Sequence, residues 1–123
     1  MSKIRSYENN RIKQIGYDEY FALARSGIRR DILLYLKDYP SGVPIFDIAK
    51  SIRASYTNTR GAILGNDGYK TNYSLFELRL VICSKSRGSL VLYQLTPRGR
   101  EVALLIEEWT RRARKKEEMI WSE

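Results

Sequence analysis

Residues 80–101 read LVICSKSRGSLVLYQLTPRGRE, and this stretch predicts a β-hairpin followed directly by a helix. Two apolar runs rich in β-branched residues, 80–83 and 90–93, are typical of paired strands. Between them lies a polar loop, 85–89, in which Gly88 suits a tight turn. The hairpin is the clearest local signal in the chain.

A long helix is expected after the hairpin. Thr96 is a favourable N-cap, Pro97 suits the first helical position, and the helical pattern extends to the region of Trp121. One face carries an apolar stripe: Val102, Leu105, Ile106, Trp109 and Ala113. So small a domain cannot cover the whole helix, and we therefore expect the stripe to form a homodimer interface. The alternative is that it packs against the first helix of its own chain.

Helical periodicity also precedes the hairpin. Apolar residues recur at spacings of three and four from Asp18 to Leu36, and Ser26 with Gly27 allows a break into two helices. The sequence YPSG at 39–42 ends this region with a turn.

Two further helices are expected next. A short extended piece at 43–45 leads into a helix that ends near Arg53, and Ser55 or Thr57 can cap another that runs to Leu64. The sequence GNDG then marks a turn, and a short helix is predicted over 71–78. The fold class is therefore mainly α with a small β-hairpin.

Composition points to a soluble protein with an anionic partner. The chain has 123 residues, which fits one domain, and a formal net charge of +8. Such an excess attracts nucleic acid or an anionic membrane surface. No apolar stretch approaches the roughly 20 residues that span a bilayer, and residues 1–11 lack the apolar core of a secretory signal. We expect no membrane partner and a cytoplasmic, nucleoid-associated location.

Several catalytic and metal-binding classes are disfavoured. Histidine is absent, which excludes catalytic triads that require it, and one cysteine cannot form a thiolate zinc cluster or an internal disulfide. That residue, Cys83, lies in a predicted strand, and we expect it to be a small buried hydrophobe. We therefore predict no enzyme activity, no metal and no cofactor.

Three stretches resemble prokaryotic winged helix-turn-helix regulators of the MarR-like and PadR-like kind. Residues 47–50 with 56–60 resemble the positioning and recognition helices, 75–81 is similar to the lead into the wing, and 93–101 closely matches the exit from the wing. The resemblance implies a winged helix-turn-helix fold with a long C-terminal helix. Together with the polar, basic N-terminus and the apolar stripe, it gives a flexible basic arm at 1–16, a DNA-binding domain at 17–96 and a dimerisation helix at 97–123.

That resemblance implies double-stranded DNA as partner and a set of contact residues. These are Tyr56, Thr57, Asn58, Thr59 and Arg60 in the recognition helix, Lys70 in the following loop, and Lys85 and Arg87 in the wing. Arg60 suits guanine and Asn58 suits adenine in the major groove. Because loop 65–71 interrupts what is usually one helix, either 57–64 or 71–78 can be the recognition helix, and we favour 57–64.

Two other functions are compatible with the same residues. A sequence-independent nucleoid protein would use the same basic surface without preferring an operator. A winged helix can also contact RNA or protein, and nine tyrosines could stack on unpaired bases.

Overall fold

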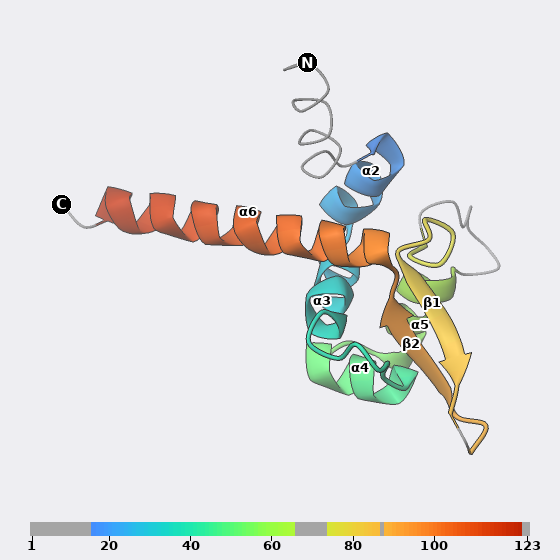
Figure 1. The fold of residues 1–123 in the computed structure, drawn as a ribbon. Coiled ribbons are helices and arrows are strands. Elements are labelled where there is room, and N and C mark those ends of the chain that lie inside the picture. The colour runs from blue at the N-terminus through green and yellow to red at the C-terminus, as the bar shows by residue number, and fades with distance from the viewer. Residues whose placement is uncertain (1–15, 66–73, 87, 122–123) are drawn as a thin grey trace.

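The computed structural model describes residues 16–65, 74–86 and 88–121. Its elements follow the predicted order of helices, hairpin and long helix (Figure 1). In chain order they are α2 (Tyr17–Arg25), α3 (Gly27–Leu36), α4 (Ile45–Ile52), α5 (Tyr56–Leu64), β1 (Val81–Lys85), β2 (Val91–Leu95) and α6 (Pro97–Trp121). The predicted N-terminal arm lies outside the described residues except for Gly16.

Helices α2 and α3 are separate, as the interruption at Ser26 suggested. The Ser26 hydroxyl caps α3 by accepting a hydrogen bond from the N–H of Arg29, at 3.2 Å. The guanidinium groups of Arg29 and Arg30 donate to the carbonyls of Ala22 and Leu23, at 3.2 and 2.6 Å. These carbonyls lie in the last turn of α2, where intrahelical donors run out. The bonds tie the end of α2 to the start of α3.

Helix α3 lies at the centre of the core. Its Ile32, Leu33 and Leu36 are fully buried, and the helix contacts α2, α4, α5, β2 and α6. Each surrounding segment contributes apolar side chains to the same cluster, among them Ile48, Ile63, Leu75, Leu80, Val102 and Ile106. One core therefore fixes the helices and the hairpin relative to one another.

The hairpin gains a third backbone partner. Strands β1 and β2 are antiparallel, with Cys83 opposite Tyr93. On the other side of β2, Val43 exchanges two backbone hydrogen bonds with Tyr93, both at 2.9 Å. The extended piece predicted at 43–45 is limited to this bridge, because Ile45 already begins α4.

The helix predicted over 71–78 is wrong for the part that the structure describes. This part forms turns, and the N–H groups of Leu75 and Phe76 donate to carbonyls at the end of α5. Leu75 and Leu80 are both fully buried. The turns bring both side chains inward, which periodicity alone does not reveal.

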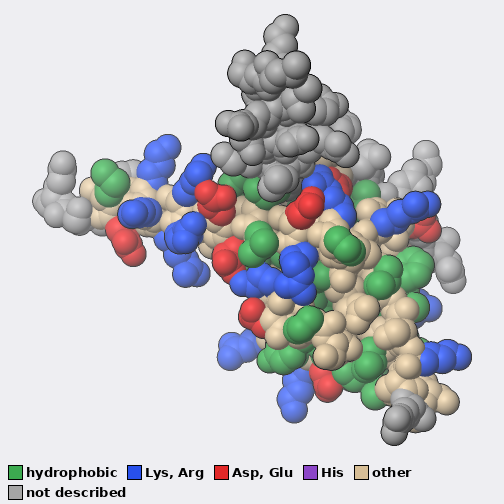
Figure 2. Space-filling view, in the orientation of Figure 1, with side chains coloured by type: hydrophobic (Ala, Val, Ile, Leu, Met, Phe, Trp, Pro, Cys, Tyr) green, Lys and Arg blue, Asp and Glu red, His purple; other side chains and the backbone are tan. Residues whose placement is uncertain are grey.

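Only the first part of α6 is covered by the rest of the described chain. Residues 107–119 are exposed apart from half-buried Glu108. The helix extends well beyond the other elements (Figure 1), and Lys and Arg side chains project from its distal part (Figure 2). A helix left in water over this length is suited to contact another molecule.

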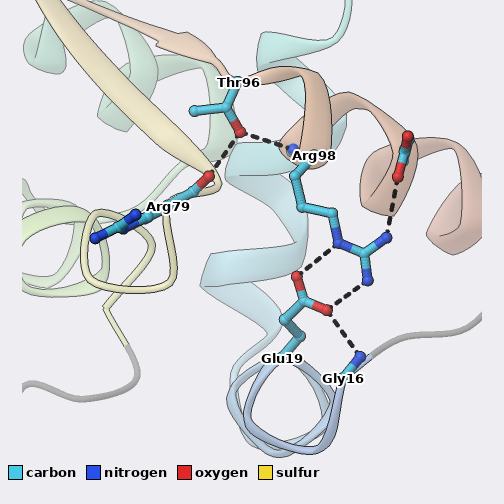
Figure 3. Close-up of polar contacts among 7 residues, drawn as sticks. Gly16, Glu19, Arg79, Thr96 and Arg98 are labelled. Atoms are coloured by element: carbon cyan, nitrogen blue, oxygen red, sulfur yellow. Dashed lines mark hydrogen bonds and ion pairs between the residues drawn. The ribbon is translucent and has the colours of Figure 1, made fainter. Parts of the chain in front are cut away.

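The start of α6 is fastened to the base of the hairpin. The Thr96 hydroxyl accepts from the N–H of Gly99 at 2.9 Å and donates to the carbonyl of Arg79 at 2.7 Å (Figure 3). The predicted N-cap is therefore confirmed. Gly99 lies so close to the backbone that an added Cβ would stand 2.0 Å from the carbonyl oxygen of Leu80.

Candidate nucleic-acid interface

A tight turn joins α4 to α5. The N–H of Ala54 donates to the carbonyl of Ala49 at 3.0 Å, and that of Arg53 donates to Lys50 at 3.3 Å. This pair of bonds is a Schellman motif, with Arg53 in the left-handed conformation at φ 58° and ψ 43°. Ser55 then caps α5, because its hydroxyl accepts from the N–H of Asn58 at 3.0 Å. The two helices and this turn form a helix-turn-helix.

The first turn of α5 presents polar side chains to solvent. Tyr56, Thr57, Asn58 and Arg60 are exposed. The opposite face is buried, down to the fully covered side chain of Ile63. The predicted recognition helix is therefore formed and is oriented with its apolar face on the core.

Thr59 does not belong to this exposed surface, contrary to the sequence prediction. Its side chain is fully buried, and its hydroxyl donates to the carbonyl of Ser55 at 2.8 Å. The reason is helical geometry, since Thr59 precedes Ile63 by four residues and faces the same side. Four of the five predicted α5 contacts remain available.

An exposed aromatic pair lies beside these residues. The rings of Phe46 and Tyr56 stack with centroids 4.7 Å apart and an angle of 23° between their planes. Phe46 is 69% exposed although its spacing in α4 was consistent with a core position. It sits at the start of α4, two residues before Ile48, and only the packing of α4 on α5 shows that it faces outward.

The wing, which is the hairpin formed by β1 and β2, provides one described cation. Lys85, at the end of β1, is exposed, and beyond it the N–H of Ser86 donates to the carbonyl of Leu90 at 2.8 Å. The other wing residue in the prediction, Arg87, lies outside the described residues, as does Lys70 of the loop after α5. Both remain predictions from sequence.

Cys83 is exposed on β1, so the prediction that it is buried is wrong. Strand β1 forms the outer edge of the hairpin, and its residues after Val81 face solvent. Opposite Cys83, Tyr93 is buried, and this burial is the largest of the effects that raise the pKa of its hydroxyl. Cys83 and Tyr56 contribute to the same rise, and Arg60 opposes it.

Four exposed cations occupy α4, the turn, α5 and the wing. They are Lys50, Arg53, Arg60 and Lys85. Their charged groups have no hydrogen bond or ion pair within the described part of the chain. This contrasts with Lys37 and Arg98, whose pKa values are raised chiefly by hydrogen bonds to Glu107 and Glu19. The helix-turn-helix and wing therefore carry positive charge that is not neutralised locally.

The stripe predicted for dimerisation is divided by the structure. Val102, Leu105 and Ile106 are buried, and Val102 and Ile106 belong to the chain's own core. For these residues the alternative of packing within the chain holds, because α6 crosses α3. Trp109, which is 43% exposed, and Ala113 remain at the surface.

Residues 16–65, 74–86 and 88–121 offer neither a metal centre nor a membrane span. No cluster of three or more Cys, Asp or Glu side chains in these segments is arranged to hold a metal ion. No helix within the same segments is both long and apolar enough to cross a membrane.

The fold is that of winged helix-turn-helix proteins, and solved structures confirm the predicted resemblance to MarR-like regulators at this level. A ZitR variant of Lactococcus lactis matches 97% of this chain and 78% of its own, with 16% identity and a TM-score of 0.61. A variant of Staphylococcus aureus MepR bound to an oligodeoxyribonucleotide matches 94% and 79%, with 14% identity and a TM-score of 0.59. This chain covers between 62% and 82% of the length of these winged-helix structures.

Sequence comparison assigns the family. The chain belongs to the EarA-like family, whose model matches residues 20–106. An uncharacterized protein of Methanocaldococcus jannaschii, MJ0905, is 34% identical over 89 residues, which cover 71% of this chain and 79% of that protein. The region of this chain that the family model matches runs from α2 to the buried part of α6, and it therefore includes the whole core.

Proposed function

We propose that this protein is a transcriptional regulator that binds double-stranded DNA with α5 in the major groove. The observation that carries the proposal is the exposed first turn of α5, whose opposite face is anchored in the core. A helix fits the major groove, and in helix-turn-helix proteins the first residues of the second helix contact base edges. The similarity in fold to MepR, solved with an oligodeoxyribonucleotide, supports the same use of the motif.

Arg60 and Asn58 are the residues proposed to recognise bases. A guanidinium can donate two hydrogen bonds to guanine, and a carboxamide can pair with adenine through one donor and one acceptor. Neither side chain is engaged by the described part of the fold, so neither has to break a bond in order to bind. Tyr56 and Thr57 complete the surface, and the Tyr56 ring is held by stacking on Phe46.

The wing is proposed to lie on the phosphate backbone or in the minor groove. Lys85 and Arg87 would contribute charge there, and Lys70 would contact phosphate from the loop after α5. These contacts would provide affinity with little sequence preference. Enzymatic function has no support from the described site, which offers exposed cations rather than an enclosed cluster of acid–base groups.

The distal part of α6 is proposed to form a homodimer. Trp109 and Ala113 continue the stripe whose first half is in the core, and Trp109 leaves a large apolar surface in water. On another side of this part of α6, a groove of about 750 Å³ lies between α3 and α6. Its wall carries both signs of charge: Lys37, Arg111, Arg114 and Lys115 with Asp38, Glu107 and Glu118. A surface with both signs can complement its own copy across a two-fold axis.

The proposed function is tested by selecting bound duplexes from a random library and sequencing them. The enriched duplex is then titrated against a scrambled one at two salt concentrations. We expect an inverted repeat with half-sites about one helical turn apart. Arg60→Ala should broaden the selected motif, whereas Lys85→Ala should weaken binding to both duplexes alike.

The other results would reassign the surface. Tight binding without enrichment would indicate a sequence-independent architectural role. Failure to bind any duplex would refute DNA recognition and leave RNA or protein as the partner of this winged helix.

A further inference from the structure

Arg53 occupies a backbone conformation that usually belongs to glycine. Its φ of 58° lies in the left-handed region, where the Cβ of an L-residue crowds the neighbouring carbonyl. The position closes α4 in a Schellman motif, in which glycine is the common residue because it lacks that Cβ. Arginine here makes the turn less stable than glycine would.

No contact within the described part of the fold explains the choice of arginine. The side chain is exposed, and its guanidinium has no hydrogen bond or ion pair with the described residues. An arginine at a strained position, without a partner in the described part of the fold, is a reason to look for function at that residue.

The location supplies a use for the charge. Arg53 lies two residues before Ser55, the N-cap of α5, and so stands beside the first turn that presents Asn58 and Arg60. A helix inserted N-terminus first into the major groove brings the preceding turn close to the phosphates that border the groove. Lys50, in the last turn of α4 just before Arg53, is also exposed.

We infer that Arg53 is a phosphate-binding residue that sets how α5 is seated in the groove. The inference rests on the proposed function and adds to it a residue that the sequence prediction did not include. A phosphate contact provides affinity and register but does not distinguish bases. Removing it should therefore weaken binding to all duplexes and reduce the dependence of affinity on salt.

The chain contains a matched control in Arg79. This residue is also an arginine with φ 58°, and its guanidinium is unpaired among the described residues. It belongs to the turn segment that is hydrogen-bonded to the carbonyls of Ala62 and Ile63, at the opposite end of α5. Arg53→Gly and Arg79→Gly remove the same charge and relieve the same strain, but only the first removes a cation beside the proposed groove contact.

The experiment compares wild type, Arg53→Gly, Arg53→Asn and Arg79→Gly. Binding to the enriched and scrambled duplexes is measured by fluorescence anisotropy at about 50 and about 200 mM KCl. Each phosphate-binding cation removed should reduce the fall in affinity between these salt concentrations by about 3.5-fold, and the proposed dimer loses two, which gives about 12-fold. Asparagine tolerates the left-handed region, so Arg53→Asn tests the charge in a second variant with an unstrained turn.

We expect both Arg53 variants to bind both duplexes more weakly, with a shallower salt dependence, and Arg79→Gly to bind like wild type. Melting temperatures of the two glycine variants should stay level or rise by up to about 4 °C. If wild type binds DNA but the Arg53 variants match Arg79→Gly, the inference is wrong and the proposed function stands. If wild type binds no duplex, both are wrong.

Discussion

The guanidinium of Arg98 binds both carboxylate oxygens of Glu19, with Nη2–Oε1 at 2.7 Å and Nε–Oε2 at 3.0 Å (Figure 3). The same carboxylate accepts the N–H of Gly16 at 2.8 Å, and Arg98 also binds Glu101 at 3.0 Å. This network joins the first turn of α2 to the first turn of α6. Because a cation at a helix N-terminus opposes the helix dipole, Arg98 depends on these acidic partners.

Glu19→Gln should lower the free energy of unfolding by about 1–2 kcal/mol, because it removes a paired charge and leaves Arg98 less compensated. Urea denaturation followed by circular dichroism measures the change. Glu108→Gln is the control, since Glu108 pairs with Arg112 at 2.7 Å in an exposed i,i+4 bridge. That bridge should contribute less than about 0.5 kcal/mol. Equal losses in the two variants would show that the link between α2 and α6 has no special role.

Gly99→Ala should destabilise the fold by about 3 kcal/mol or more, although alanine in a helix is normally better than glycine by about 1 kcal/mol. The new Cβ would stand 2.0 Å from the carbonyl oxygen of Leu80, which also accepts the N–H of Thr96 at 3.0 Å. Thermal and urea unfolding both test this. Gly27→Ala is the control, because its nearest contact would be 3.6 Å away at the end of Arg30. A Gly99→Ala protein as stable as wild type would mean that α6 can move away from the carbonyl of Leu80 without loss of stability.

Asn58→Ala and Thr59→Val should separate DNA binding from stability at two adjacent residues. Asn58 is exposed with no side-chain partner among the described residues, so its removal should weaken binding to the enriched duplex and leave the melting temperature unchanged. Thr59 is buried and bonded to Ser55, so Thr59→Val should cost about 1 kcal/mol and leave affinity intact. Anisotropy titrations and melting curves measure the two effects. The reverse pattern would place Thr59 rather than Asn58 at the DNA.

Trp109→Glu should convert the proposed dimer into a folded monomer, because it places a charge in the apolar interface without disturbing the core. Sedimentation velocity measures the change in mass, and circular dichroism checks folding. Leu104→Glu is the control: Leu104 is 50% exposed, similar to Trp109, but lies about 140° away around α6. A wild-type monomer, or dissociation by both substitutions, would argue against an interface centred on Trp109.

Local signals in the sequence determined most of the elements. The cap at Thr96, the break at Ser26, the apolar runs of the hairpin and the cap at Ser55 each act through neighbouring residues, and each appears in the structure. Such interactions depend on a few adjacent positions, so pattern and propensity can reveal them. Helix α5, the proposed recognition helix, was predictable as a helix for the same reason.

Only the tertiary structure decided which faces these elements bury. Thr59 is covered, Phe46 and Cys83 are exposed, and Val102 and Ile106 are inside the monomer. Each outcome depends on which segments, distant in sequence, pack against that side chain. The left-handed conformation of Arg53 likewise belongs to the turn that ends α4 before α5. Sequence therefore defined the helices, the hairpin and their order, whereas packing determined the surface that they present.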